Sequence, residues 1–196
     1  MRYDFDEAYT KDFLGWGDNA TQQKILAEYF VPKIIKEFQP KYVLDVGCGA
    51  GQWLDEYRKH NIKAIGVEGS SNAWEVMSEE TKEVVVEWDL RDTMHDEDWS
   101  IDFAQSFEVA EHIEKEYDDI FLHNLLKDDP DVVLLTAAQP TQNGSHHVNC
   151  QEREYWMTKM KNMGYLFNQD LLNKIKSWGE PDNCPVWWHS NLMVFV

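Results

Sequence analysis

Two patterns of hydrophobic and polar positions alternate along the chain. Short runs of branched and aromatic apolar residues are followed by longer segments in which apolar residues recur every three or four positions. The first pattern is typical of buried strands and the second of amphipathic helices. The patterns predict strands over 41–47, 63–69, 83–90, 101–108, 131–138 and 191–196. They predict helices over 21–38, 51–61, 71–80, 111–128 and 153–164, the first broken or entered anew at Pro32.

This alternation predicts an α/β fold. Strands that alternate with helices join through right-handed crossovers into a mostly parallel sheet. Because the strands are almost continuously apolar, helices should cover both faces and form a three-layer sandwich. Without repeats or linkers, we expect one domain over 1–196, with 1–38 as a helical lid or cap segment and 39–196 as a Rossmann-like core. Ligands of such sheets bind beyond the carboxyl ends of the strands, beside the first strand.

A glycine-rich turn follows the first expected strand, in "VLDVGCGAGQWL". Gly47, Gly49 and Gly51 permit a tight strand-to-helix turn and a close approach of a ligand to the backbone. A dinucleotide-binding turn needs G-x-G-x-x-G, but its third glycine position holds Gln52. Asp45 precedes the turn, and a carboxylate there suits a ligand with a cationic end. A pyrophosphate ligand is therefore a poor match.

A second acidic residue narrows the choice of ligand. Glu68 ends the second expected strand, about twenty residues after the turn, where an acid can accept both ribose hydroxyls. The pattern describes an adenosine ligand that carries a positive group and no phosphates. S-adenosylmethionine is that ligand, and it is the expected cofactor.

With these motifs the chain resembles the class I S-adenosylmethionine-dependent methyltransferases, from about Ile34 onward. "VLDVGCGAGQWL" resembles the first family motif, "GVEGS" the ribose-binding turn, "EWDL" the adenine motif and "SFEVAEHI" the motif beside the methionine part of the cofactor. The resemblance implies a seven-stranded sheet whose last strand lies antiparallel beside the fifth and sixth. It implies that Asp89 meets the adenine amino group and Leu90 its ring face. The implied cofactor-binding residues are Asp45, Gly47, Gly49, Gly51, Glu68, Gly69, Asp89, Leu90, Phe107 and Glu108.

Candidate catalytic residues follow the fourth and fifth strands. Methyl transfer to oxygen usually needs a base or a metal to remove the hydroxyl proton. Glu108, Glu111 and His112 have the spacing of one helical face, and His146 and His147 should reach the same edge of the sheet. Carboxylates with imidazoles suit Mg, Mn or Fe better than structural zinc. We therefore expect Glu111, His112 and His147 to be catalytic, and these three with Glu108 to be the metal ligands; without a metal, a histidine could act alone as the base.

The E-x-x-E-H run also has a family resemblance. It resembles the divalent-metal site of the small-RNA 3′-end 2′-O-methyltransferases, and some ubiquinone-pathway O-methyltransferases carry a similar run. In the RNA enzymes a downstream histidine completes the site, a part that His147 could play, but their usual RNA-binding domain has no room in 196 residues. In the alternative interpretation Glu108 contacts the cofactor, Glu111 begins a helix and His112 packs.

Charge and composition narrow the partners. The formal net charge of −18 disfavours phosphate backbones, so a small-molecule acceptor is favoured over a long nucleic acid. No apolar run is long enough for a membrane span, and three widely spaced cysteines without a signal peptide suggest the cytoplasm. The oligomeric state stays open. The expected function is O-methylation of a small molecule or of a nucleotide or sugar hydroxyl; a metal-assisted RNA 2′-O-methyltransferase and a non-catalytic cofactor-binding module are the alternatives.

Aromatic residues near both ends give two further hypotheses. Tyr9, Phe13 and Trp16 could form a lid over the cofactor or pack as ordinary hydrophobic residues. "CPVWWHSN", with Trp187 and Trp188, is interpreted as a buried hairpin corner rather than a substrate platform. Trp53 and Trp88 are assigned to the core rather than to the adenine pocket.

Overall fold

Six strands form one sheet in the computed structural model, which describes residues 10, 18–95, 99–142 and 144–196. Five neighbouring strands run parallel and β6 is antiparallel to β5. The strand order is β3-β2-β1-β4-β5-β6, so the chain reverses direction across the sheet after β3, between β1 and β4. The bounds are β1 (Tyr42–Val46), β2 (Lys63–Glu68), β3 (Val85–Glu87), β4 (Phe103–Phe107), β5 (Val132–Thr136) and β6 (Met193–Phe195).

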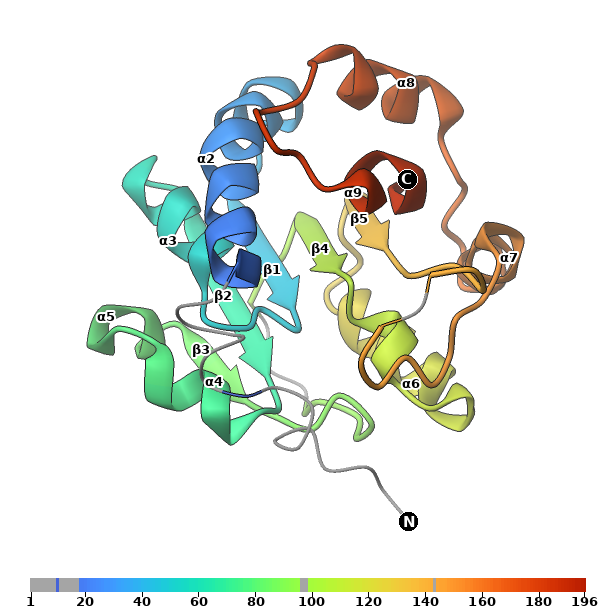
Figure 1. The fold of residues 1–196 in the computed structure, drawn as a ribbon, viewed down its shortest axis with the longest axis horizontal. Helices are drawn as coiled ribbons and strands as arrows, with labels where there is room; N and C mark the ends of the chain where they lie inside the picture. Colours follow the sequence, from blue (N-terminus) through green and yellow to red (C-terminus); the bar gives the residue numbers. More distant parts are fainter. Residues whose placement is uncertain (1–9, 11–17, 96–98, 143) are drawn as a thin grey trace.

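Helices cover both faces of this sheet, which confirms the predicted three-layer α/β architecture (Figure 1). One layer contains α2 (Asp18–Phe38), α3 (Gln52–Lys59), α4 (Ser71–Val76), α8 (Gln169–Ser177) and α9 (Val186–Asn191). The other contains α6 (Asp118–Leu125) and α7 (Arg153–Asn162). The remaining short elements are α5 (Glu79–Lys82) and the 3-10 turns η2 (Ala110–His112) and η3 (Lys115–Tyr117).

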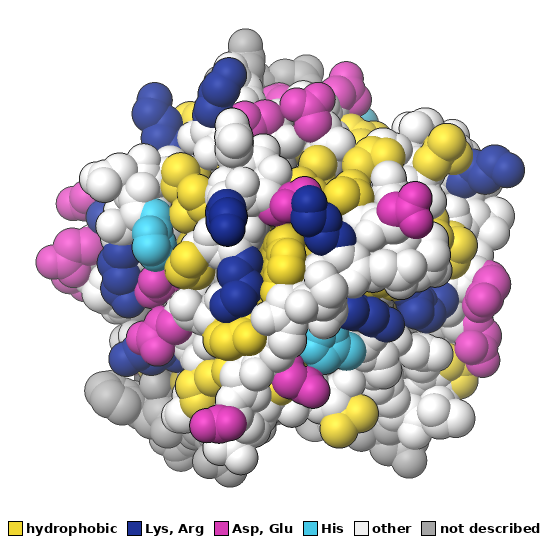
Figure 2. All heavy atoms as spheres, turned by 90° about the horizontal axis from the view of Figure 1, so that it is seen from above, with side chains coloured by type: hydrophobic (Ala, Val, Ile, Leu, Met, Phe, Trp, Pro, Cys, Tyr) yellow, Lys and Arg dark blue, Asp and Glu magenta, His cyan; other side chains and the backbone are white. Residues whose placement is uncertain are grey.

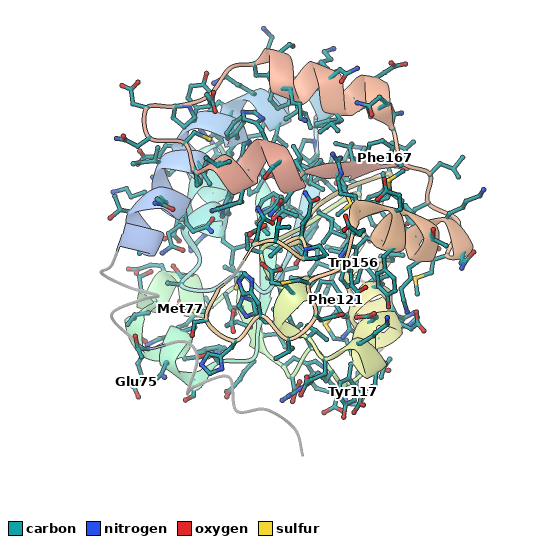
Figure 3. The ribbon with its side chains drawn as sticks, turned by 45° about the vertical axis from the view of Figure 1, so that its right-hand side comes forward. Glu75, Met77, Tyr117, Phe121, Trp156 and Phe167 are labelled. Carbon is teal, nitrogen blue, oxygen red and sulfur yellow. The ribbon has the colours of Figure 1, made fainter. Side chains whose placement is uncertain are left out.

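The alternation of side chains along the strands separates two cores. In β1, Val43 faces the α2 and α3 layer and Leu44 faces the opposite layer, because successive strand residues point to opposite faces. Phe121 of α6 and Trp156 of α7 are both fully buried in the second core (Figure 3). The apolar content of both faces explains why the strand sequences are almost continuously hydrophobic.

The seven-stranded sheet implied by the family resemblance is not what the described residues form. The segment Leu166–Asn168 occupies the place of the additional strand. Leu166 N–H donates to the Val196 carbonyl at 2.8 Å and Asn168 N–H to the Val194 carbonyl at 2.8 Å. The pairing ends there because the Asn168 side chain accepts from Leu171 N–H at 3.0 Å and begins α8. A helix cap therefore replaces the continuation of a strand.

Two helix predictions were wrong in detail. Helix α2 runs unbroken through Pro32, because the neighbouring Val31 and Ile34 are buried and tertiary packing outweighs the lost hydrogen bond. The expected helix over 111–128 is divided into η2, η3 and α6. Glu111 and His112 therefore lie on a tight 3-10 turn instead of one α-helical face, and Glu108 precedes it with a left-handed φ of 55°.

The described helices and surface also bear on partners. Within the described ranges, no helix is both long enough and apolar enough to cross a membrane. On the face shown in Figure 2, Lys and Arg side chains are interspersed with Asp and Glu. Charges of both signs are therefore present on this face.

Gly51 begins α3 and gives a test of this packing. It has a φ of 83°, and a Cβ there would collide with the Thr81 side chain. We expect Gly51→Ala to lower the free energy of unfolding by about 2–4 kcal/mol, from backbone strain and overpacking together. Denaturant unfolding measures this loss. Gly164→Ala is the matched control, because Gly164 has a φ of 97° with nothing within 4 Å of its Cβ position. Equal losses in the two variants would show that the Thr81 contact contributes nothing.

Candidate functional site

A cavity of about 340 Å³ opens at the carboxyl ends of β1, β2 and β4. This is the edge of the sheet at which parallel α/β folds bind ligands, beside the point where the strand order reverses. Most of the residues chosen from the sequence line it: Asp45, Gly47, Gly49, Glu68, Gly69, Leu90, Phe107, Glu108, Glu111, His112 and His147. One continuous space therefore contains both the glycine turn and the Glu–His–His group.

The turn between β1 and α3 is held against the end of β2. Gly47 N–H donates to the Val67 carbonyl at 2.8 Å, and a Cβ on Gly47, whose φ is 76°, would collide with Val109. The Glu68 carboxylate accepts from Gly49 N–H at 2.8 Å with one oxygen and from Ser70 N–H at 2.8 Å with the other. Each carboxylate oxygen can accept more than one hydrogen bond, so a fixed Glu68 can also receive ligand hydroxyls.

Asp45 is a buried carboxylate with an unsatisfied atom. Its side chain lines the cavity and is 2% exposed, and its Oδ2 has no hydrogen-bond partner in the described part of the chain. Burial raises the pKa of Asp45 to about 7; the nearby Gln105 amide opposes this rise and the charge of Glu68 adds to it. A buried carboxylate without a partner is costly, so this position is suited to a cationic ligand group.

Glu108 stands at the junction of the two halves of the cavity. Its backbone has a left-handed φ of 55°, which is uncommon for a residue other than glycine. The Thr136 hydroxyl accepts from Glu108 N–H at 2.8 Å, and the Glu108 carboxylate accepts from the Asn191 amide at 3.0 Å. Burial raises the pKa of Glu108, while the hydrogen bond from Asn191 opposes the rise. This strained turn aims Glu108 toward Glu111.

Glu111, His112 and His147 converge in the cavity, each offering one ligand atom within 4.8 Å of the others. Glu111 is fully buried, and neither of its carboxylate oxygens receives a hydrogen bond from a donor in the described residues. Burial raises the pKa of Glu111 well above its ordinary value, and the neighbouring charge of Glu108 raises it further. Buried carboxylate oxygens of this kind are suited to a proton or a cation.

The two imidazoles are oriented by backbone carbonyls. His112 Nδ1 lies 3.1 Å from the His146 carbonyl, and His147 Nδ1 lies 3.0 Å from the Gln142 carbonyl. Because a carbonyl only accepts, each Nδ1 carries the hydrogen and each Nε2 is the nitrogen without one, as in metal-binding histidines. Burial lowers the pKa of His112 to about 4, so this ring is neutral near pH 7. Gly144 lies against the His147 ring, which leaves no space for a Cβ.

Long-range contacts fix the segment that carries His147. The Glu111 carbonyl accepts from both Val148 N–H and Asn149 N–H at 2.9 Å. The Asn149 amide donates to the buried Asp118 carboxylate at 2.7 Å, and the Tyr155 hydroxyl donates to the other Asp118 oxygen. The loop after β5 is thereby tied to η2 and to α6 and α7.

Some expected site residues lie elsewhere. Asp89 does not line the cavity, and its carboxylate pairs with Arg91, with the Arg91 Nε and NH2 atoms each 2.8 Å from a carboxylate oxygen. Gly51 is a packing position behind the turn and not a lining residue. Trp88, which was assigned to the core, packs against the second core outside the lining, and its indole N–H donates to the Asp92 carbonyl at 2.9 Å. Tyr9, Phe13 and Trp16 lie outside the described residues.

Other lining residues had no clear signal in the sequence. Gln23 of α2 lines the cavity and accepts from the Trp53 indole N–H at 2.9 Å, and Trp53 lines the cavity as well as packing in the core. The predicted hairpin corner near the C-terminus is instead helix α9, in which Trp187 lines the cavity and Trp188 is buried. These residues come from both ends of the chain, so no local pattern could have grouped them.

Comparisons with known proteins agree with this geometry. The chain matches the family model described as a methyltransferase domain over residues 21–181. No curated protein sequence matches it. The methyltransferase domain of a bacterial protein, CtHen1, is 20% identical with a TM-score of 0.57 over 90% of this chain and 98% of that one.

Two further similar structures contain a bound cofactor product. Magnesium protoporphyrin IX methyltransferase from Synechocystis PCC 6803, with bound SAH, is 13% identical with a TM-score of 0.61, covering 89% of this chain and 82% of that one. The plantazolicin methyltransferase BpumL, in complex with a desmethyl analogue and SAH, is 14% identical with a TM-score of 0.60, covering 91% of this chain and 85% of that one. At these identities the similarity concerns the fold.

The raised pKa of Asp45 predicts how stability depends on pH. The unfolded chain loses this proton near pH 4, but the folded chain retains it until about pH 7, so the stability of the ligand-free protein falls as the pH rises between these values. We expect Asp45→Asn to raise the free energy of unfolding at pH 8 by on the order of 2–4 kcal/mol relative to wild type, with a smaller difference at pH 4. Urea unfolding across this range measures the difference. The exposed Asp170→Asn is the control, and a pH-independent difference between Asp45→Asn and wild type would contradict the expectation.

Proposed function

The chain belongs to the methyltransferase domain family, and on that premise we propose that it transfers the methyl group of S-adenosylmethionine to a hydroxyl oxygen of a small molecule, or of a nucleotide or sugar. One observation carries this proposal. A single cavity joins the buried, unsatisfied Asp45 carboxylate to the buried group formed by Glu111, His112 and His147. The first feature suits a cationic cofactor and the second suits removal of a proton from an acceptor.

The residues around the glycine turn fit S-adenosylmethionine. The cofactor supplies an electrophilic methyl group on a sulfonium and also carries an ammonium group, for which Asp45 is the buried partner. Glu68, held by two backbone N–H groups, would accept the ribose hydroxyls, and the buried Leu90 would cover the adenine ring. Gly47 lines the cavity without a side chain, so a ligand can approach its backbone closely. The SAH bound in two structures with the same fold agrees with this assignment.

The Glu–His–His group fits a divalent cation. Glu111 provides two buried oxygens without donors, and His112 and His147 provide Nε2 atoms set by carbonyls on the opposite side of each ring. Glu108, beside Glu111, would be a fourth ligand. This set of oxygen and nitrogen donors suits Mg or Mn. Such a cation would lower the pKa of an acceptor hydroxyl.

The chain's own groups account for the remaining steps. The cavity walls position the acceptor oxygen for in-line attack and exclude water from it. As the new C–O bond forms and the C–S bond breaks, the hydroxyl proton must leave. In the absence of a cation, a neutral imidazole of His112 or His147 would accept it. Both mechanisms, with and without a cation, depend on the fixed positions of Glu111 and of the two imidazole rings.

A small acceptor is more compatible with the negative charge of the protein than a long nucleic acid is. With a formal net charge of −18, the protein repels long phosphate backbones. The alternative acceptor is the 3′ end of an RNA, which is supported by the resemblance of the E-x-x-E-H run and His147 to the metal site of RNA 2′-O-methyltransferases. Transfer of a radiolabelled methyl group to a panel of sugars, nucleosides, phenols and short RNAs distinguishes these acceptors.

The first test of this function concerns Glu68. We expect Glu68→Ala to weaken binding of S-adenosylmethionine and of its demethylated product by about 10–100-fold, which corresponds to about 1–3 kcal/mol of lost charge-assisted hydrogen bonds. Isothermal titration calorimetry measures both ligands. Glu87→Ala is the matched control, because Glu87 is the register partner of Glu68 on β3 and is exposed. An unchanged dissociation constant in a folded Glu68→Ala variant, or tight NAD binding to the wild type, would overturn the cofactor assignment.

The second test concerns the cation. We expect EDTA to abolish methyl transfer and Mg²⁺ or Mn²⁺ to restore it. We expect Glu111→Gln to weaken Mn²⁺ binding at least tenfold, as measured by the loss of the free Mn²⁺ signal in electron paramagnetic resonance. Glu116→Gln is the control, because Glu116 lies one turn away in η3 and is exposed. Activity that resists EDTA and no Mn²⁺ binding would disprove the metal assignment; the histidine-base variant would then require activity to fall at low pH.

A further inference from the structure

A second group of potential metal ligands lies outside the cavity, where the chain passes from α8 to α9. Glu180 and Cys184 lie in the connection and His189 lies in α9. Each offers one ligand atom, and these atoms lie within 4.8 Å of one another. None of the three lines the cavity already described. This group is therefore a separate feature of the surface.

The spacing within the group is that of ligands around an ion. His189 Nε2 and Glu180 Oε2 are 3.6 Å apart, which is too long for a good hydrogen bond. Two ligands bound at about 2.0–2.2 Å with tetrahedral angles lie about 3.4 Å apart. The other ring nitrogen, His189 Nδ1, is buried and has no hydrogen-bond partner among the described residues. The ring is therefore held by one long contact to Glu180, and its Nδ1 is not satisfied by the described residues.

We propose that Glu180, Cys184 and His189 form a second metal site, which takes a borderline-soft dication of the Zn²⁺ class. Thiolate sulfur, imidazole nitrogen and carboxylate oxygen are the three donor types that Zn²⁺ uses in proteins, whereas Mg²⁺ avoids sulfur. A thiolate and a carboxylate also balance the charge of one dication. On binding, Cys184 releases its thiol proton to solvent and the ion keeps one position for water.

An ion at this site would act on the wall of the cavity. His189 is flanked in α9 by Trp187, which lines the cavity, and by Asn191, which donates to Glu108 at 3.0 Å. Trp188, between them, is fully buried against Phe30, with ring centroids 4.6 Å apart. The ion would tie the connection that carries Glu180 and Cys184 to this helix. It would therefore fix the position of Trp187 and Asn191 without touching the reacting atoms.

Titration of the metal-free, full-length protein with Co²⁺ tests this site. A cobalt ion bound to a thiolate gives a sulfur-to-metal charge-transfer band in the near ultraviolet, and a site of carboxylates and imidazoles gives none. We expect the band in wild type and its complete loss in Cys184→Ser. Cys150→Ser is the matched control, because Cys150 Sγ lies 3.5 Å from His147 Nδ1 and is the thiol that the first group could recruit. The band should persist in that variant.

A second measurement distinguishes loss of metal binding from misfolding of a variant. Zn²⁺ should raise the melting temperature of wild type and of Cys150→Ser by more than it raises that of Cys184→Ser, in which only the Glu111, His112 and His147 group remains. The unliganded melting temperature of Cys184→Ser should stay near that of wild type. The exposed Glu180→Gln should weaken Zn²⁺ binding at least tenfold without changing the fold. A band that survives in Cys184→Ser but disappears in Cys150→Ser, or no band in folded wild-type protein, would overturn the proposal. The first result would instead add Cys150 to the ligands of the first group, and the second would leave the function proposed for the cavity unaffected, because the two groups share no ligand.

Discussion

The backbone of the turn between β1 and α3, folded back onto the end of β2, is the constraint on which the rest of the site depends. Gly47 and Gly49 have φ values of 76° and 54°, a region that most side chains avoid. That conformation brings Gly49 N–H to Glu68 and Gly47 N–H to the Val67 carbonyl, each at 2.8 Å. Two strands and one helix are thereby joined at a single bare stretch of backbone. The cavity exists because no side chain of the turn fills it.

Acid burial is the second organising feature. Asp45, Glu108 and Glu111 all line one cavity, and burial raises the pKa of each. Three buried carboxylates are unfavourable in a protein core, because each loses hydration and because the charge of Glu108 also acts against ionisation of Glu111. A cation at either end of the cavity relieves both costs. The buried carboxylates therefore lower the stability of the ligand-free protein, and binding of positive groups should raise it.

The sequence was most informative where one local pattern determined the structure. Strand positions, the glycine turn and Glu68 could be read directly, and the family match confirms the resemblance carried by those motifs. The division of the predicted helix over 111–128 into η2, η3 and α6 could not be predicted, because apolar residues recur with a helical period through all three elements. Gln23 and Trp187 line the cavity from opposite ends of the chain, so their roles arise only from tertiary packing. The same holds for Cys184, because the spacing of Glu180, Cys184 and His189 along the chain is not a recognisable motif.

The two halves of the cavity are held by different kinds of structure. Asp45 and Glu68 are fixed by the sheet and by backbone hydrogen bonds, which any chain with this topology can reproduce. His147 instead depends on a loop that is tied to η2 and, through Asn149, to Asp118. Loops of this kind vary between proteins while their scaffold does not. Structures with this fold are accordingly named for methylating molecules as unlike as magnesium protoporphyrin IX and plantazolicin, at 13% and 14% identity to this chain. Under the proposed function, cofactor binding would follow from the topology, and the acceptor would be selected by the segments around Glu111 and His147 and by the wall that α9 provides.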